Sequence, residues 1–536
     1  MKGSSVPLPR TFYNILPIIR RTSSVSTQQP YEEFYRYTSG RWLWDEEQEL
    51  RDRYSPFNVP ELQKAAASSV GATECVAMMK LAEGSFNKIF KLSMDNGLNV
   101  LARIPHPIAG PKYYTTASEV ATMEFARDIL EIPVPRIYAW NADADHPVGS
   151  EFIIMEEAPG TKLDDIWYDL PLKEKVAIME DLVSLQKKML LVSFHRYGNL
   201  YFASEAIQGA VAAEITGNVS EETRKAVRSR FVVGPVVERG YWNKERATME
   251  LDRGPWEKPQ QYAASLACRE MQWIKQYARP LPEDDPLVDS ESQNSPESHI
   301  QLLEKYLKVA ELLLPADRDL VAPHIWHTDL HAGNLFVDKG RISCVIDWQG
   351  IWAAPLMLRA RHPRLVDYNG DIILERPENF KDLDADEKAK VNEQVAKSII
   401  LYLYEKQIAR EVPLLHRVLQ LRHGPTRCDP IQYWHKLGYD FPCPIHFTEE
   451  EIRIHREEGE GWNEAQDFWD AVAHIVSRDG WTPNHLYNDA AALFAGLRET
   501  GLKSMAGKER DDFQKQTQWL DEASKAVKSA KSRSLV

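Results

Sequence analysis

The sequence has no long apolar run, few cysteines and no excess of basic residues. None of its apolar stretches approaches the roughly 18 uninterrupted residues of a membrane-spanning helix, so no such helix is expected. Its 536 residues include only 5 cysteines, and this odd, widely spaced set does not indicate a disulfide framework. The formal net charge of −14 at pH 7 argues against broad nucleic-acid binding, which requires a basic surface.

The first 31 positions contain four basic residues and no acidic residue; the first acidic residue is Glu32. Serine and threonine are frequent in the same segment, and short apolar groups lie between the basic positions. This composition is typical of a mitochondrial transit peptide. We therefore expect residues 1–30 to be a transit peptide and the protein to be mitochondrial, with the matrix as its compartment. The alternative is an untargeted, disordered tail.

The most informative feature is a polar run that begins at His327 and leads to an Asp-Trp pair at 347–348. Asp329, Asn334 and Asp347 have the spacing of a phosphoryl-transfer catalytic loop and its metal-binding Asp. The apolar residues between Asn334 and Asp347 predict two short strands joined by a Gly-containing turn, which would fold these two side chains back towards each other. The alternative is a polar loop in a β-hairpin that has these spacings by chance.

Each polar residue of this run has an expected role. We predict that Asp329 accepts the proton of a substrate hydroxyl or orients that hydroxyl. Asn334 and Asp347 are predicted catalytic residues that bind Mg²⁺, which prefers oxygen ligands, under the phosphates of a nucleotide. The neighbouring His327 and His331 are expected to hold the loop rather than to act chemically.

Over roughly residues 70 to 500, the chain resembles the aminoglycoside phosphotransferase and choline kinase family. Its N-terminal half and the lengths between its motifs are most similar to the fungal mitochondrial "altered inheritance of mitochondria" phosphotransferase-like proteins. The resemblance implies an α+β, bilobal, protein-kinase-like fold with a small β-rich N-lobe and a large, mainly helical C-lobe. It also implies the use of ATP, but it does not supply an acceptor.

The expected nucleotide lobe begins with a strand, a turn and a strand over residues 81–92, in which Gly84, Ser85 and Phe86 form the turn. In a kinase-like fold, the backbone N–H groups of this turn cover the phosphates. Arg103 on the next strand is the expected cation for the α- and β-phosphates, in the place where protein kinases have Lys. By the resemblance, Glu119 on a helix over 115–130 orients Arg103; Glu124 is the weaker candidate.

A buried strand over 151–155 ends at Glu156 and Glu157, which are followed by a Pro-Gly turn. By position, this is the link between the lobes, where adenine would bind the backbone near these two residues.

No protein-kinase activation segment follows Asp347, because residues 350–355 are short and lack an APE match. This absence favours a small-molecule acceptor over a protein.

The sequence divides into five expected parts. These are the transit peptide 1–30, an aromatic-rich extension 31–70, the N-lobe 71–157, the C-lobe 158–502 and a charged tail 503–536. The extension is expected to pack on the folded body, with an independent binding segment as the alternative. Residues 283–298 are polar and predict a surface loop. Helices are expected over 171–192, 262–277, 299–314, 385–410, 462–478 and 485–500.

Three functions are consistent with these residues. The leading hypothesis is a mitochondrial phosphotransferase that moves the γ-phosphate of ATP to a hydroxyl or amine of a small molecule. The second is a weakly active or inactive pseudokinase that binds nucleotide and acts through protein partners in mitochondrial maintenance. It is supported by the single glycine of the turn, by Arg103 in place of Lys and by the extensions at both ends. The third is a protein kinase or nucleotidyl transferase on the same scaffold.

Overall fold

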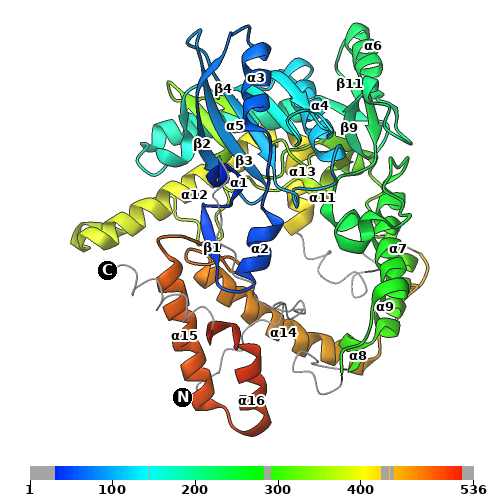
Figure 1. Ribbon diagram of the computed structural model, residues 1–536. Coiled ribbons are helices and arrows are strands. Elements are labelled where there is room, and N and C mark those ends of the chain that lie inside the picture. The colour runs from blue at the N-terminus through cyan, green and yellow to red at the C-terminus, as the bar shows by residue number, and fades with distance from the viewer. Residues whose placement is uncertain (1–30, 144, 283–290, 424–433, 435–439, 522–536) are drawn as a thin grey trace, which may run out of the picture.

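The N-lobe is built on a five-stranded antiparallel sheet with the strand order β2-β3-β4-β6-β5 (Figure 1). The structure is a computed structural model that describes residues 31–143, 145–282, 291–423, 434 and 440–521. The predicted transit peptide therefore lies outside the described residues. The strands are β2 (Cys75–Glu83), β3 (Asn87–Met94), β4 (Asn99–Pro105), β5 (Ile137–Asn141) and β6 (Phe152–Glu156).

The alternation of side chains along β3 gives the sheet one buried face. Phe90, Leu92 and Met94 point into a core that they share with α3 (Val59–Ser69), while the residues between them are partly exposed. The side chain of Asn58 caps the start of α3 by accepting a hydrogen bond from the Glu61 backbone N–H at 3.2 Å.

The two lobes meet through α4 (Tyr114–Asp128), which contacts β5 and β6 of the N-lobe and β9 (Asn199–Phe202) of the C-lobe. The C-lobe core surrounds a hairpin of β14 (Leu335–Asp338) and β15 (Arg341–Val345). Around it pack helices α5 (Leu172–Met189), α12 (Ala385–Glu411) and α13 (Pro413–His423). The predicted α+β, bilobal, kinase-like fold is confirmed.

The remaining elements are mostly short. The helices of ten or more residues are α6 (Glu221–Arg230), α7 (Pro259–Tyr277), α9 (Pro296–Ala310), α14 (Glu449–Val472), α15 (Tyr487–Ser504) and α16 (Gly507–Gln516). The shorter helices are α1 (Glu32–Tyr35), α2 (Glu46–Asp52), α8 (Glu291–Asn294), α10 (Arg318–Val321) and α11 (Leu356–Arg359). The short strands are β1 (Gly40–Trp42), β7 (Thr161–Lys162), β8 (Val192–Phe194), β10 (Val211–Ala212), β11 (Ile215–Gly217), β12 (Phe231–Gly234), β13 (Pro323–Ile325), β16 (Ala353–Pro355) and β17 (Trp481–Pro483). Among the described residues, no helix combines the length and the apolar character needed to cross a bilayer.

Two predictions of secondary structure were wrong in part. A surface loop was expected over residues 283–298. Residues 283–290 lie outside the described part of the chain, and α8 and the start of α9 occupy most of residues 291–298. The hydroxyl of Ser295 accepts a hydrogen bond from the Ser298 backbone N–H at 3.2 Å and so begins α9. The helix expected over 462–478 is α14, which starts earlier, at a capping box of Thr448 and Glu451.

The aromatic extension packs on the folded body. Trp42 is only 1% exposed, and β1 pairs antiparallel with β17, so that Trp42 lies opposite Trp481. Trp44 packs against Trp519, with ring centroids 4.9 Å apart, in a cluster contributed by α14 and α15. In Figure 1, β1 and α2 lie between the N-lobe sheet and helices α14 to α16. The extension thus joins the last helices of the described chain to the nucleotide lobe.

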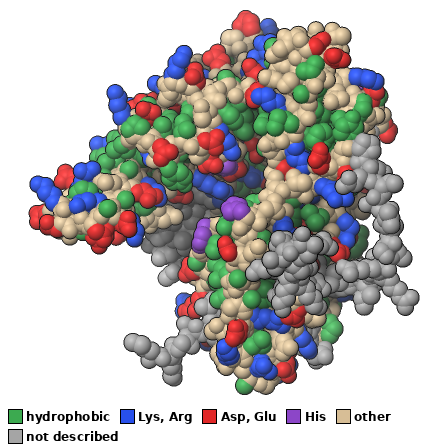
Figure 2. All heavy atoms as spheres, turned by 60° about the vertical axis from the view of Figure 1, so that its left-hand side comes forward, with side chains coloured by type: hydrophobic (Ala, Val, Ile, Leu, Met, Phe, Trp, Pro, Cys, Tyr) green, Lys and Arg blue, Asp and Glu red, His purple; other side chains and the backbone are tan. Residues whose placement is uncertain are grey.

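The surface seen in Figure 2 carries charges of both signs. Over the described residues of this face, the Lys and Arg side chains alternate with Asp and Glu side chains rather than gathering into one large patch. This mixture is consistent with the balance of 65 basic and 79 acidic residues in the sequence.

Candidate active site

The predicted hairpin positions the candidate catalytic residues. β14 and β15 are joined by Lys339 and Gly340, both in the left-handed region with φ of 49° and 74°, as a two-residue hairpin turn requires. After the hairpin, the Ile346 backbone N–H donates to the Asn334 carbonyl oxygen at 3.0 Å. The segment that carries Asp347 is thereby fixed beside the one that carries Asn334, as the sequence predicted.

Asn334 is directed by its contact with Asp329. Its Nδ2 donates to the Asp329 carbonyl oxygen at 3.0 Å and lies 3.4 Å from the carboxylate Oδ2. Because Nδ2 is used in this way, Oδ1 is the atom that Asn334 can offer to a cation. An amide oxygen and the Asp347 carboxylate are suitable ligands for Mg²⁺, so this pair of residues fits the metal that the sequence predicts.

Asp329 is held in its ionised form. The hydrogen bond from His331, whose Nε2 is 3.4 Å from the carboxylate, is the main cause that lowers the pKa of Asp329; Arg364, at 3.7 Å, adds to it. A carboxylate that is ionised at neutral pH can accept a hydrogen bond from a substrate hydroxyl. Asp329 can therefore orient an attacking oxygen and take up its proton as the phosphoryl group is transferred.

His327 links the catalytic loop to the strand end before Asp347. Its Nε2 is 3.0 Å from the Ile346 carbonyl oxygen, and its Nδ1 accepts from the Asp329 backbone N–H at 3.3 Å. The ring is buried and meets the ring of Trp348 edge to face at 5.1 Å. Burial lowers the pKa of His327, which favours the neutral ring that these two hydrogen bonds require. The structure thus gives His327 contacts that hold the loop.

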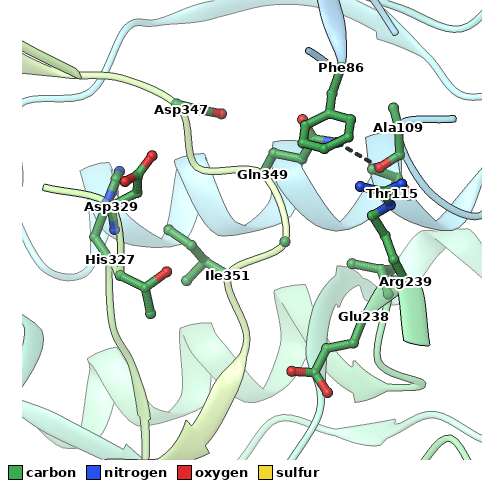
Figure 3. A pocket seen from close by; sticks show the side chains of 13 residues that line it. Phe86, Ala109, Thr115, Glu238, Arg239, His327, Asp329, Asp347, Gln349 and Ile351 are labelled. Carbon is green, nitrogen blue, oxygen red and sulfur yellow. Dashed lines mark hydrogen bonds between the residues drawn. The ribbon is translucent and has the colours of Figure 1, made fainter. Parts of the chain in front are cut away.

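Asp347 has a backbone conformation that residues other than glycine rarely adopt. Its φ is 63°, in the left-handed region, where Asp and Asn are the most tolerated of the larger residues. Such conformations persist where the surrounding structure enforces them, and they are concentrated at functional sites. Here the short turn that follows β15 directs the Asp347 carboxylate into the cavity between the lobes (Figure 3).

The expected cation pair is present. Arg103 on β4 forms an ion pair with Glu119 on α4, and the two residues are only 6% and 4% exposed. Burial lowers the pKa of Arg103 to about 10, while the nearby charge of Asp347 raises it, so the guanidinium stays protonated at neutral pH. The weaker candidate Glu124 instead faces Arg230 at 3.0 Å in a partly exposed pair. The structure therefore selects Glu119 as the partner of Arg103.

Gln349 is a site residue that the sequence analysis missed. Its Oε1 accepts from Arg103 Nη2 at 2.6 Å and from Asn87 Nδ2 at 2.8 Å. Its Nε2 donates to the Ala109 carbonyl oxygen at 3.0 Å (Figure 3). The uncharged Gln349 side chain thus hydrogen-bonds the C-lobe to three parts of the N-lobe: Arg103 on β4, the start of β3 and the loop after β4.

We expect the substitution Gln349→Ala to loosen this junction. Arg103 and Asn87 would each lose an acceptor, and a partly buried donor without a partner costs about 1–3 kcal/mol. The free energy of unfolding should therefore fall by about that amount in urea titrations. The matched control is Gln394→Ala, which removes a single contact of 3.4 Å with the Asp371 carbonyl oxygen. Equal stability losses for the two variants would contradict the interlobe role of Gln349.

The turn that was expected to cover the phosphates is held by backbone hydrogen bonds and lies next to a buried lysine. Gly84 N–H donates to the Asn87 carbonyl oxygen at 2.9 Å, and His106 N–H donates to the Phe86 carbonyl oxygen at 2.8 Å. The Phe86 side chain lines the cavity, whereas Gly84 and Ser85 do not. Behind the turn, the fully buried Lys88 donates from Nζ to the Tyr35 and Arg53 carbonyl oxygens at 2.7 and 3.1 Å.

Acid is expected to weaken the packing behind the turn through His106. This residue is 2% exposed, and burial, helped by the charge of Lys88, lowers its pKa to about 3. Below its ordinary pKa of about 6.5, the unfolded chain takes up a proton that the folded chain does not, so stability falls as the pH falls. From pH 6.5 to pH 5, this loss should be about 1.6 kcal/mol. Urea titrations should show a shallower pH dependence for His106→Gln than for the control His195→Gln; equal slopes would exclude this effect.

Glu156 and Glu157 lie at the link between the lobes but do not line the cavity. The Glu156 carboxylate accepts from the Arg136 backbone N–H at 3.1 Å, and Glu157 pairs with Lys91 at 2.8 Å. Directly after them, β7 pairs with β14 of the catalytic hairpin. The structure thus places this link against the catalytic segment, and a contact with adenine remains a prediction.

A cavity of about 260 Å³ lies between the lobes. It brings together Asp329 and Asp347 of the C-lobe with Phe86 of the turn (Figure 3). Arg103 and Asn334 do not line it, but each is bonded to a residue that does. The arrangement combines two acidic groups, a buried cation pair and a covering turn, which are the components of a phosphoryl-transfer site.

Comparison with known proteins assigns the chain to a family. The family model described as "Phosphotransferase enzyme family" matches residues 80–356, which is more than half of the chain, and the chain belongs to this family. A subtelomeric hrmA-associated cluster protein of Aspergillus fumigatus is 30% identical over 466 residues, which cover 76% of this chain and 88% of that protein.

Other relatives carry a location in their names. "Altered inheritance of mitochondria protein 9, mitochondrial" of Yarrowia lipolytica is 24% identical over 501 residues, which cover 85% of each chain. The same name recurs for relatives in other fungi, so the predicted resemblance and the predicted mitochondrial location are confirmed. Among solved structures, aminoglycoside phosphotransferase APH(4)-Ia in complex with ADP and hygromycin B is 14% identical, with a TM-score of 0.30, over 68% of this chain and 99% of that one.

Proposed function

We propose that this mitochondrial family member transfers the γ-phosphate of ATP to a hydroxyl or amine of a small molecule. The main support is that Asp329 and Asp347 line one cavity, with Asn334 bonded to Asp329 and with the buried Arg103–Glu119 pair bonded to Gln349 of the cavity lining. These residues would divide the roles of phosphoryl transfer between them: a base, ligands of the metal, and a cation for the phosphates with its orienting carboxylate.

The proposed reaction proceeds by direct displacement. Asp329 accepts a hydrogen bond from the acceptor hydroxyl and receives its proton. The acceptor oxygen forms a bond to the γ-phosphorus while the bond from that phosphorus to the β–γ bridging oxygen breaks, and ADP leaves. Arg103 stabilises negative charge on the phosphates, and Glu119 orients its guanidinium. Bound Mg²⁺, held by Asn334 Oδ1 and the Asp347 carboxylate, would neutralise charge on the β- and γ-phosphates.

The alternative is a pseudokinase that binds nucleotide and acts through protein partners. One observation favours it, because Arg103 Nη2 is already bonded to the neutral oxygen of Gln349 instead of being free for a phosphate. The single glycine of the covering turn, Gly84, points the same way. In this alternative, nucleotide stabilises the fold and no acceptor is phosphorylated.

Mg²⁺-dependent stabilisation by ATP tests the nucleotide site shared by both functions. For a chain that starts at residue 31, ATP at about one hundred times its Kd should stabilise the fold by about 2.7 kcal/mol in the presence of Mg²⁺. Asp347→Ala should remove most of this effect, because the metal loses its charged ligand, whereas Asp338→Ala on the same hairpin should keep it. Thermal unfolding with ATP, with and without Mg²⁺, provides the measurement; the absence of any shift would rule out both functions.

A further inference from the structure

The cavity is also lined by a basic residue, Arg239, which has no assigned role in nucleotide binding. If the adenine end binds at the link near Glu156, the triphosphate points towards the turn, and groups beyond Phe86 face the acceptor. The guanidinium of Arg239 lies 4.6 Å from the centre of the Phe86 ring, at the cavity wall. In Figure 3, Arg239 and Glu238 lie on one side of the cavity, and Asp329 and Asp347 lie on the other.

Arg239 is available to a ligand. Within the part of the chain that the structure describes, no carboxylate lies within ion-pair distance of its guanidinium, so its known contact is the ring of Phe86. The neighbouring Glu238 does not neutralise it, because Glu238 is paired with Arg359 and also accepts from the Tyr262 hydroxyl at 3.3 Å. Among the described residues, Arg239 therefore offers an unpaired positive charge on this side of the cavity, opposite the carboxylates of Asp329 and Asp347.

A further guanidinium comes from the segment after α11. Arg364 is 79% exposed and lies 3.7 Å from the Asp329 carboxylate, which lines the cavity. We call Arg239 and Arg364 the acceptor rim.

The acceptor rim is positive in a chain whose formal net charge is −14. Arg239 lines the cavity, and Arg364 lies beside the Asp329 carboxylate. These two side chains would hold a carboxylate or a phosphate, to which the planar guanidinium offers two parallel donors. We propose that the acceptor is an anionic hydroxy compound, whose hydroxyl meets Asp329 and whose carboxylate or phosphate group binds the acceptor rim. This inference rests on the proposed phosphotransferase function.

The test compares small molecules that differ mainly in charge. One set is glycerol, glycerate, glycerol 3-phosphate and 3-amino-1,2-propanediol; the other is glucose, gluconate, glucose 6-phosphate and glucosamine. The full chain is presented with each compound in two assays: transfer of label from γ-labelled ATP, and thermal unfolding with and without the non-transferable analogue AMP-PNP and Mg²⁺. The carboxylate and phosphate members show which anionic group is preferred.

We expect at least one anionic member to bind or react better than its neutral and cationic counterparts. Arg239→Gln and Arg364→Gln should each weaken this member about tenfold or more, as expected for a lost hydrogen bond between charged groups. The control is Arg228→Gln, because Arg228 is likewise exposed, at 68%, and has a single carboxylate nearby at 3.5 Å. It should leave the preference for the anionic member intact.

Two results would overturn the inference. One is an equal or better response to the neutral or cationic members, and the other is no response to any anionic member in either assay. Failure of the proposed function would be seen separately, as the absence of any stabilisation by AMP-PNP and Mg²⁺. The unfolding measurements without nucleotide still decide whether the acceptor rim binds anions in that case.

Discussion

Replacing Asp329 with Asn is expected to slow phosphoryl transfer by about 10²- to 10⁴-fold, the usual contribution of a positioned general base. The amide keeps the shape of the carboxylate but cannot take up the acceptor proton. It also loses the charge that His331 and Arg364 stabilise. Release of label from γ-labelled ATP, to an acceptor from the charge-matched sets or to water, gives the rate.

The matched control for this substitution is Asp338→Asn. Asp338 is exposed at the end of β14, on the same hairpin, and does not line the cavity. The Asp338→Asn variant should transfer phosphate at the rate of the unmodified protein. If Asp329→Asn were as active as this control, with both variants folded, Asp329 could not be the catalytic base.

The second large effect is expected on stability. Glu119→Gln would leave the guanidinium of Arg103 buried without its carboxylate, and breaking a buried ion pair on one side costs about 3–5 kcal/mol. Gln349 would remain as a neutral acceptor of one hydrogen bond, which does not replace the charge. Urea unfolding of the two proteins at pH 7 measures the difference.

Glu124→Gln, one turn along the same helix, provides the comparison. Its partner Arg230 is 38% exposed and also contacts Asp128 at 2.8 Å, so a change of about 0–1 kcal/mol is expected. Similar losses for the two variants would mean that the Arg103–Glu119 pair has no special place in the fold. A large loss confined to Glu119→Gln would show that the buried Arg103–Glu119 pair stabilises the fold.

The hairpin that carries Asn334 and leads to Asp347 could be predicted from the sequence because it rests on local patterns. Short apolar runs and a Lys-Gly turn determine β14 and β15, and the spacing within the motif then places Asn334 beside Asp347. The pairing of Arg103 with Glu119 came from the family resemblance instead, and the structure contains this pair.

Gln349 could not be found in this way. An uncharged side chain gives no electrostatic signal in a sequence, and its partners Arg103, Asn87 and Ala109 are more than 200 residues away along the chain. The acceptor rim was missed for a related reason: Arg239 and Arg364 look like ordinary surface arginines until the fold brings Arg239 to the cavity and Arg364 to Asp329. Its Arg-rich segment also follows Asp347 too closely to be recognised as a separate motif.

The extension was recognised as a packed segment, but its partner was not. β1 pairs with β17, which lies more than 400 residues later, and no local pattern in either three-residue strand specifies the other. The burial of Lys88 was also unexpected, because its ammonium group is satisfied by the carbonyl oxygens of Tyr35 and Arg53 instead of by water. Both features depend on contacts that exist only in the complete fold.

The pairing of β1 with β17 has a consequence for the order of folding. A contact between segments so distant in sequence forms late, because a long chain must first be brought together. The extension is made first, yet its strand has no partner until residues 481–483 are available, and Asn484 then donates to the Thr38 carbonyl oxygen at 2.8 Å. Until the extension docks, Lys88 lacks the carbonyl groups that allow its burial. The β1–β17 pair, although its first strand lies early in the chain, is therefore among the last contacts of the molecule to form.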